Sequence, residues 1–159
     1  MPPASGRVSI ALLPRDLAGP VEPLWAAVQG MAPDALVSGG FLRTRLEATG
    51  DVRFYSNWQG GFAALCPRQG TVVTDRFARA LEAWRAGARV DQEAGAALRD
   101  LRCTCGETHD LATLSFAPAA GFARGCVWLL DVSDGALRPE ALAALEAACG
   151  GVRVVLRRG

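Results

Sequence analysis

Three residues that can bind a metal or carry thiol chemistry lie in the stretch LRCTCGETHDL, residues 101–111. They are Cys103, Cys105 and His109, the only histidine of the chain. A further cysteine, Cys66, opens the segment CPRQG. Three thiolates and one imidazole are a standard ligand set for structural zinc. These four residues are therefore the candidate metal ligands of this sequence.

The spacing of these ligands departs from that of a zinc knuckle, a tight hairpin turn that usually supplies Cys-x-x-Cys followed by glycine. In CPRQG, Gln69 stands where the second cysteine would lie, and CTCG has the shorter Cys-x-Cys spacing. We favour knuckle-shaped hairpins that are held by packing without metal, because zinc affinity depends on all four ligands. The alternative is one structural zinc held by Cys66, Cys103, Cys105 and His109.

The same stretch could support thiol chemistry. A cysteine nucleophile needs a neighbouring base and a third group that orients the base, and Cys105, His109 and Asp110 can be arranged in that way. Cys103 and Cys105 could instead form a redox pair. No flanking catalytic motif accompanies them, so a thiol or redox enzyme using Cys103, Cys105 and His109 is kept as an alternative function.

Hydrophobic periodicity predicts the elements that position these residues. Before residue 60 it predicts a strand at 7–14, a helix at 20–32 and a hairpin of strands 41–48 and 52–58. Thr74 is the expected N-cap of a helix at 74–87. The last third predicts a strand at 125–132, a helix at 137–150 and a strand at 151–158, with the two strands parallel and adjacent. Cys126 and Cys149 lie within these apolar elements and are expected to be buried small hydrophobic residues.

These elements predict an α+β fold with a mixed β-sheet and helices. It contains a degenerate zinc-ribbon-like hairpin pair and a C-terminal β-α-β unit. We expect residues 1–159 to form a single compact domain with three parts. These are a β-α-β-β part at 1–59, a knuckle-helix-knuckle part at 60–124 and the β-α-β part at 125–159.

A set of residues between positions 60 and 157 matches a known pattern: Cys66, Pro67, Gly70, Trp84, Cys105, Gly106, Leu111, Leu114, Phe116, Pro118, Gly121, Phe122, Ala123 and Arg124. In these residues the chain resembles an uncharacterised group of small bacterial proteins. Its members carry a Cys-Pro-x-Cys-Gly knuckle, a Pro-Cys-Cys-Gly knuckle and a Pro-Ala-Gly-Phe-Ala-Arg block. Gln69 and Thr104 replace two of that group's four cysteines, so Cys103 and His109 would substitute for them. The resemblance implies an architecture and no activity.

Net charge, apolar runs and cysteine number limit the classes of function that fit this chain. The net charge is +1, which gives no global field for nucleic acid. No apolar run approaches the roughly 20 residues that a membrane span needs, and we expect a cytoplasmic protein. Five cysteines in that compartment are not expected to form disulfides.

We therefore predict a non-catalytic protein-interaction module that binds a bacterial protein partner, as an immunity-type or adaptor protein does. Self-association into a homo-oligomer is also open. The alternative is a zinc-ribbon module that binds nucleic acid through arginine–phosphate contacts. The predicted partner surface is the hairpin before residue 60, with Arg43, Arg45, Arg53, Tyr55 and Trp58.

Overall fold

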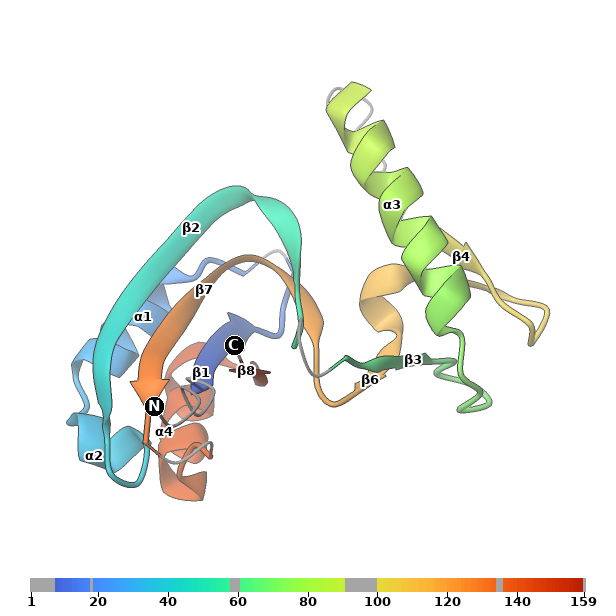
Figure 1. Ribbon diagram of the computed structural model, residues 1–159. Helices are drawn as coiled ribbons and strands as arrows, with labels where there is room; N and C mark the ends of the chain where they lie inside the picture. The colour runs from blue at the N-terminus through green and yellow to red at the C-terminus, as the bar shows by residue number, and fades with distance from the viewer. Residues whose placement is uncertain (1–7, 18, 58–60, 91–99, 134–135, 159) are drawn as a thin grey trace, which may run out of the picture. The chain divides into compact units, whose positions relative to one another are not determined.

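The computed structural model describes residues 8–17, 19–57, 61–90, 100–133 and 136–158, without the side chains of 87–90. The chain forms two compact units, which we describe separately (Figure 1). The first contains the described residues up to Gly61 and from Pro118 onward, and the second runs from Phe62 to Ala117. Helices and strands occur in both units, which confirms the predicted α+β class.

The first unit is a four-stranded antiparallel sheet with three helices. Its elements are β1 (Val8–Pro14), α1 (Glu22–Gln29), α2 (Pro33–Leu36), β2 (Phe41–Tyr55), β7 (Gly121–Val132), α4 (Pro139–Cys149) and β8 (Val152–Arg158). The strand order is β2-β7-β1-β8. The N-terminal strand therefore lies in the middle of the sheet, between two strands from the end of the chain.

This strand order corrects the predicted C-terminal β-α-β unit. The three elements form, but β7 and β8 are not neighbours, because β1 pairs antiparallel with both of them. Every strand pairing among the described residues is antiparallel, so the expected adjacent parallel pair is absent there. The local pattern of β7, α4 and β8 carries no information about a distant strand that inserts between them.

The predicted hairpin before residue 60 is also wrong. Residues 41–55 form one long strand, β2, whose two halves both pair with β7. The register shifts between Ala48 and Arg53, which marks a β-bulge or similar irregularity. Gly50 has φ +73°, and the Thr49 hydroxyl donates to the backbone of this segment at Asp51 O, 2.7 Å away. The glycine that suggested a turn therefore accommodates an irregular bend within one strand.

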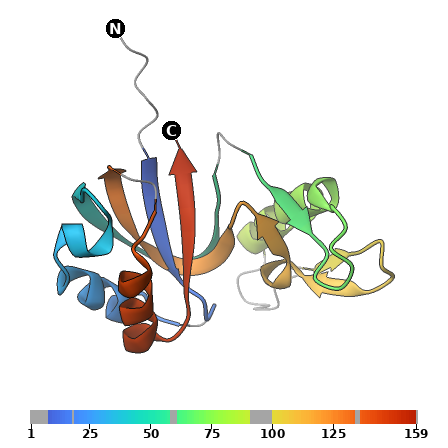
Figure 2. The same ribbon diagram turned by 90° about the horizontal axis from the view of Figure 1, so that it is seen from below.

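The three helices pack on one face of the sheet (Figure 2). Leu24 and Val28 of α1 and Leu145 of α4 are buried there against Ile10 and Val127 of the sheet. The apolar residues of α1 recur at helical spacing, which is why one side of the helix is buried. The helix is shorter than the predicted 20–32.

The described residues of the second unit form two short two-stranded sheets, one long helix and one helical turn. Its elements are β3 (Ala63–Leu65), α3 (Thr74–Val90), β4 (Asp100–Arg102), β5 (Thr108–Asp110), the 3-10 helix η1 (Leu111–Thr113) and β6 (Ser115–Ala117). β3 pairs with β6, and β4 pairs with β5. Residues 91–99, part of the region predicted to be loop or frayed helix, lie outside the described residues.

The core of the second unit is built around three aromatic rings. Phe77 of α3 is 1% exposed. The centroid of its ring lies 5.8 Å from the ring centroid of Phe62 and 5.1 Å from that of Phe116. All three pairs are edge-to-face, a favourable arrangement for aromatic side chains. α3 begins at Thr74, the residue predicted to start it. The Thr74 hydroxyl accepts the backbone N–H of Ala64 at 3.1 Å, which joins the helix to β3.

The bounds of the predicted middle part, 60–124, are similar to those of the second unit, Phe62–Ala117. Strands from the predicted first and third parts form one sheet. That the two units behave as a single domain stays a prediction. Within the described ranges, no helix combines the length and the apolar character needed to cross a membrane.

Candidate metal centre

The first knuckle is the tight turn that follows β3. The backbone N–H of Cys66 donates to Thr71 O at 2.9 Å, and that of Gly70 donates back to Cys66 O at 2.8 Å. Gly70 has φ +70°, a conformation that glycine adopts without strain. The backbone N–H of Gln69 points at Cys66 Sγ, 3.4 Å away. The turn therefore fixes the Cys66 sulfur and supplies a hydrogen-bond donor to it.

The second knuckle follows β4 and is one residue shorter. The backbone N–H of Cys103 donates to Glu107 O at 2.9 Å, and that of Gly106 donates to Cys103 O at 3.1 Å. Gly106 has φ +90°. The first knuckle closes between positions i and i+5, whereas this one closes between i and i+4. The second turn is one residue shorter, which matches the Cys-x-Cys spacing of Cys103 and Cys105 in place of Cys-x-x-Cys.

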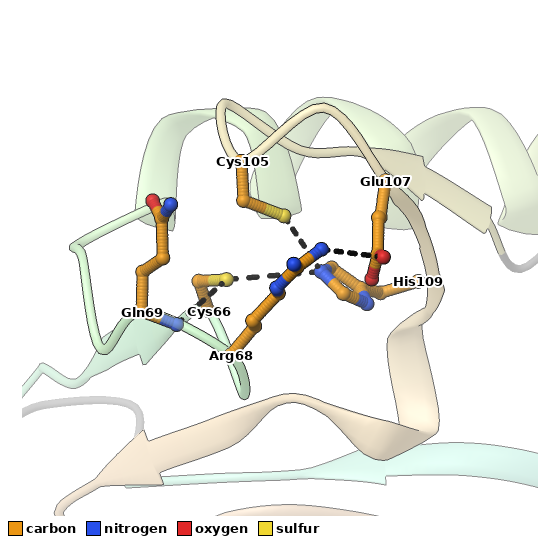
Figure 3. Close-up of polar contacts among 6 residues, drawn as sticks. All are labelled: Cys66, Arg68, Gln69, Cys105, Glu107 and His109. Atoms are coloured by element: carbon orange, nitrogen blue, oxygen red, sulfur yellow. Dashed lines mark hydrogen bonds and ion pairs between the residues drawn. The ribbon is translucent and has the colours of Figure 1, made fainter.

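The fourth residue, His109, is positioned by strand pairing. It lies on β5 opposite Leu101 of β4, two residues beyond the closing residue of the turn. Its Nε2 is 3.3 Å from Cys105 Sγ and 3.7 Å from Cys66 Sγ. The imidazole thus reaches thiols from both knuckles (Figure 3).

The structure brings all four predicted ligands into one cluster. One ligand atom from each of Cys66, Cys103, Cys105 and His109 lies within 4.8 Å of every other. Cys66 and Cys103 are buried, and the other two are half-buried. This cluster could hold a metal ion. The four residues come from two segments that are 37 positions apart in the sequence (Cys66 to Cys103).

The donor set suits zinc, and two of the ligand-to-ligand distances are those of a tetrahedral site. Zinc bonds of about 2.3 Å to sulfur and about 2.0–2.1 Å to nitrogen would place sulfur and nitrogen roughly 3.5 Å apart at a tetrahedral centre. The two sulfur–nitrogen distances of 3.3 and 3.7 Å lie on either side of that value. Gln69 contributes its backbone N–H, and its side chain extends away from Cys66 Sγ (Figure 3).

The turns also favour the thiolate form of the two buried cysteines. Backbone hydrogen bonding, led by Cys105, lowers the pKa of Cys103 to about 7. Burial acts to raise the pKa of Cys66, but the backbone N–H groups of Gln69 and Arg68 bring it below its ordinary value. A thiolate is the form of cysteine that binds metal.

An ion pair connects the two knuckles. Arg68 Nη1 from the first turn contacts Glu107 Oε1 from the second at 2.5 Å (Figure 3). Both side chains are more than half exposed, so the pair contributes at most about 1 kcal/mol to stability. Sequence analysis did not identify this pair, because the two residues become neighbours only when the turns meet.

The alternative of a catalytic Cys-His pair gains less from the geometry. Asp110, the candidate orienting group, accepts the backbone N–H of Ala112 through Oδ1 at 2.9 Å and so caps η1. His109 Nε2 faces two thiols, whereas a nucleophile and its base form one pair. All five cysteines are free thiols. The convergence of several sulfurs on one imidazole is the arrangement expected of a metal site.

The predicted partner-binding residues lie in the first unit. Arg43, Arg45 and Arg53 are exposed along β2. Tyr55, in contrast, is 4% exposed, and its hydroxyl donates to Glu47 Oε2 at 2.8 Å. That these residues contact a partner stays a prediction. The prediction for Trp58 falls outside the described residues.

The two cysteines outside the cluster differ in burial. Cys126 is buried as expected, but it also makes a polar contact, since its thiol points at Glu47 Oε2, 3.6 Å away. The cross-strand register of β2 and β7 places Glu47 opposite Cys126, and no local sequence signal marks that pairing. Cys149 at the end of α4 is half-buried.

Comparison with known proteins adds no further assignment: no family model, curated protein or solved structure matches this chain.

Proposed function

We propose that the second unit binds one structural zinc ion through Cys66, Cys103, Cys105 and His109. The observation that carries this proposal is the convergence of their four ligand atoms within 4.8 Å. A set of three sulfurs and one nitrogen matches zinc better than magnesium or calcium, which prefer oxygen ligands. The zinc would connect the two knuckles, which the exposed Arg68–Glu107 ion pair also joins.

A zinc ion at this site would have a structural role. Catalytic zinc keeps one coordination position open for water or substrate, whereas structural zinc is closed by four protein ligands. Here the chain supplies all four. The site also occupies the only histidine and three of the five cysteines of the chain. The residues on which a thiol or redox enzyme would depend are therefore bound to the metal.

For the whole chain we propose a non-catalytic protein-interaction module of the bacterial cytoplasm, acting as an immunity-type or adaptor protein. Exposed residues on β2 support this proposal. Leu42 is 80% exposed, a high value for a large hydrophobic side chain, and Arg43 and Arg53 are exposed on the same strand. Arginine is among the residues enriched at energetically important positions of protein interfaces.

The zinc proposal is tested by elemental analysis of protein purified without metal-affinity resin. The expected result is about one zinc per chain, falling in Cys66→Ser and His109→Ala. Cys149→Ser is the matched control, because it removes a half-buried thiol outside the cluster and should keep the zinc. Metal-free parent protein with a folded second unit would overturn the proposal. Equal zinc loss in Cys149→Ser would show that the metal is bound elsewhere.

The interaction proposal is tested by affinity capture with the parent and with a Leu42→Asp, Arg43→Glu variant that retains its zinc. A partner protein retained by the parent and lost by the variant is the expected result. Equal retention by both would reject β2 as the contact surface. Capture of nucleic acid, with an affinity that falls steeply as salt rises, would favour the nucleic-acid alternative.

A further inference from the structure

The face of the first sheet that carries no helix has its own cluster of side chains. Its buried members are Ala11, Leu13, Tyr55, Ala123, Cys126, Trp128 and Val155. Polar and charged residues surround the ring of Trp128 on this face. They come from β2, β7 and β8, which the strand order places within one sheet.

Two arginines lie against Trp128. The guanidinium carbon of Arg157 is 4.8 Å from the ring centroid, and that of Arg45 is 5.9 Å from it. Arg45 lies directly opposite Trp128 in the β2–β7 register, and Arg157 reaches the ring from β8. Each contact is a favourable cation–π interaction. Together they bring two positive charges to one indole ring.

The hydrogen-bond donors of this cluster exceed its acceptors. Trp128 Nε1 and Arg157 Nε are both buried and have no hydrogen-bond partner. Trp128 as a whole is only 4% exposed. Leaving a buried donor unsatisfied is costly, and more so for a charged group. Burial lowers the pKa of Arg157; Cys126 and Glu47 act against this effect, and the positive charge of Arg45 adds to it.

One carboxylate, that of Glu47, lies nearby. Its Oε2 accepts the Tyr55 hydroxyl at 2.8 Å and the Cys126 thiol at 3.6 Å. Among the described residues, it forms no ion pair with Arg45 or Arg157. The two arginines and this carboxylate leave one net positive charge.

We propose that this cluster is a binding site for an oxyanion, a carboxylate or phosphate group, that accepts hydrogen bonds from Trp128 Nε1 and Arg157. An arginine fork matches the oxygens of either group. Arg45 is exposed and marks the side from which the anion enters. The site lies wholly within the first unit and is independent of the zinc site.

The test follows the indole N–H signal of Trp128 by NMR while inorganic phosphate or, separately, acetate is added. Trp128→Phe assigns that signal, because it removes the N–H and keeps an aromatic ring. A saturable shift with either anion is the expected result, and the anion that gives it identifies the source of the oxygens. No saturable shift with either would mean that water satisfies both donors, which overturns the proposal.

Variants separate this site from general charge attraction. Arg157→Gln should weaken binding by roughly tenfold or more, since it removes the charged fork. Arg157→Lys keeps the charge and the fold if the glutamine variant unfolds, and it should also bind more weakly. Arg53→Gln is the matched control, because it removes an exposed positive charge from β2 outside the cluster. Equal weakening by Arg53→Gln would reject the specific site.

Discussion

Phe77→Ala should weaken binding of the proposed zinc ion, because Phe77 packs against the part of the second unit that positions Cys66. The side chain is 1% exposed and joins α3 to the rings of Phe62 and Phe116, and Phe116 lies on the strand paired with β3. Cys66 directly follows β3. The position of this ligand therefore depends on the aromatic core.

The size of the effect follows from the burial of this ring. Replacing a buried phenylalanine with alanine costs about 3–5 kcal/mol, which includes two edge-to-face pairs worth about 0.5–1.5 kcal/mol each. The second unit is small enough that we expect its metal-free form to be unfolded, so binding and folding are linked. A loss of about 4 kcal/mol then becomes an affinity reduced roughly thousandfold, at about 1.4 kcal/mol for each factor of ten.

The assay is competition for zinc against a chromogenic chelator, with Phe122→Ala as the control. Phe122 is also buried and pairs edge-to-face with Phe54 at 4.9 Å, but it belongs to the first unit. It should lower the stability of that unit and leave zinc affinity unchanged. The reasoning is refuted if Phe77→Ala binds zinc as tightly as the parent, or if both variants weaken binding equally.

Two further predictions concern the first unit. Burial raises the pKa of the Cys126 thiol well above its ordinary value. The folded unit therefore keeps this thiol neutral at a pH at which the unfolded chain loses the proton. The free energy of unfolding should decrease as the pH rises above about 8.5, by up to about 1.4 kcal/mol per pH unit. Urea unfolding at pH 8 and pH 10 should show a smaller difference for Cys126→Ala than for the parent, and an equal difference would contradict this assignment. Gly125→Ala should destabilise the unit by about 1–3 kcal/mol, because the new Cβ would lie 2.5 Å from the backbone oxygen of Glu47. A melting temperature equal to that of the parent would show that β2 and β7 can separate without cost.

The sequence determined the identity of the four candidate ligands. Cys66, Cys103, Cys105 and His109 could be chosen because thiols and imidazole are the usual side-chain ligands of structural zinc, and the three cysteines lie in glycine-bearing turn motifs. The α+β class and most elements near the chain ends also followed from local periodicity. These features depend on neighbours in sequence, where side-chain spacing and backbone preference act directly.

Only the tertiary structure decided whether those ligands meet. The shorter second turn and the pairing of His109 with Leu101 bring the imidazole to both knuckles. The same holds for the sheet. The insertion of β1 between β7 and β8, and the pairing of both halves of β2 with one partner, are contacts between distant segments. Local sequence patterns cannot specify such pairings, because they depend on which distant strand buries the same apolar face.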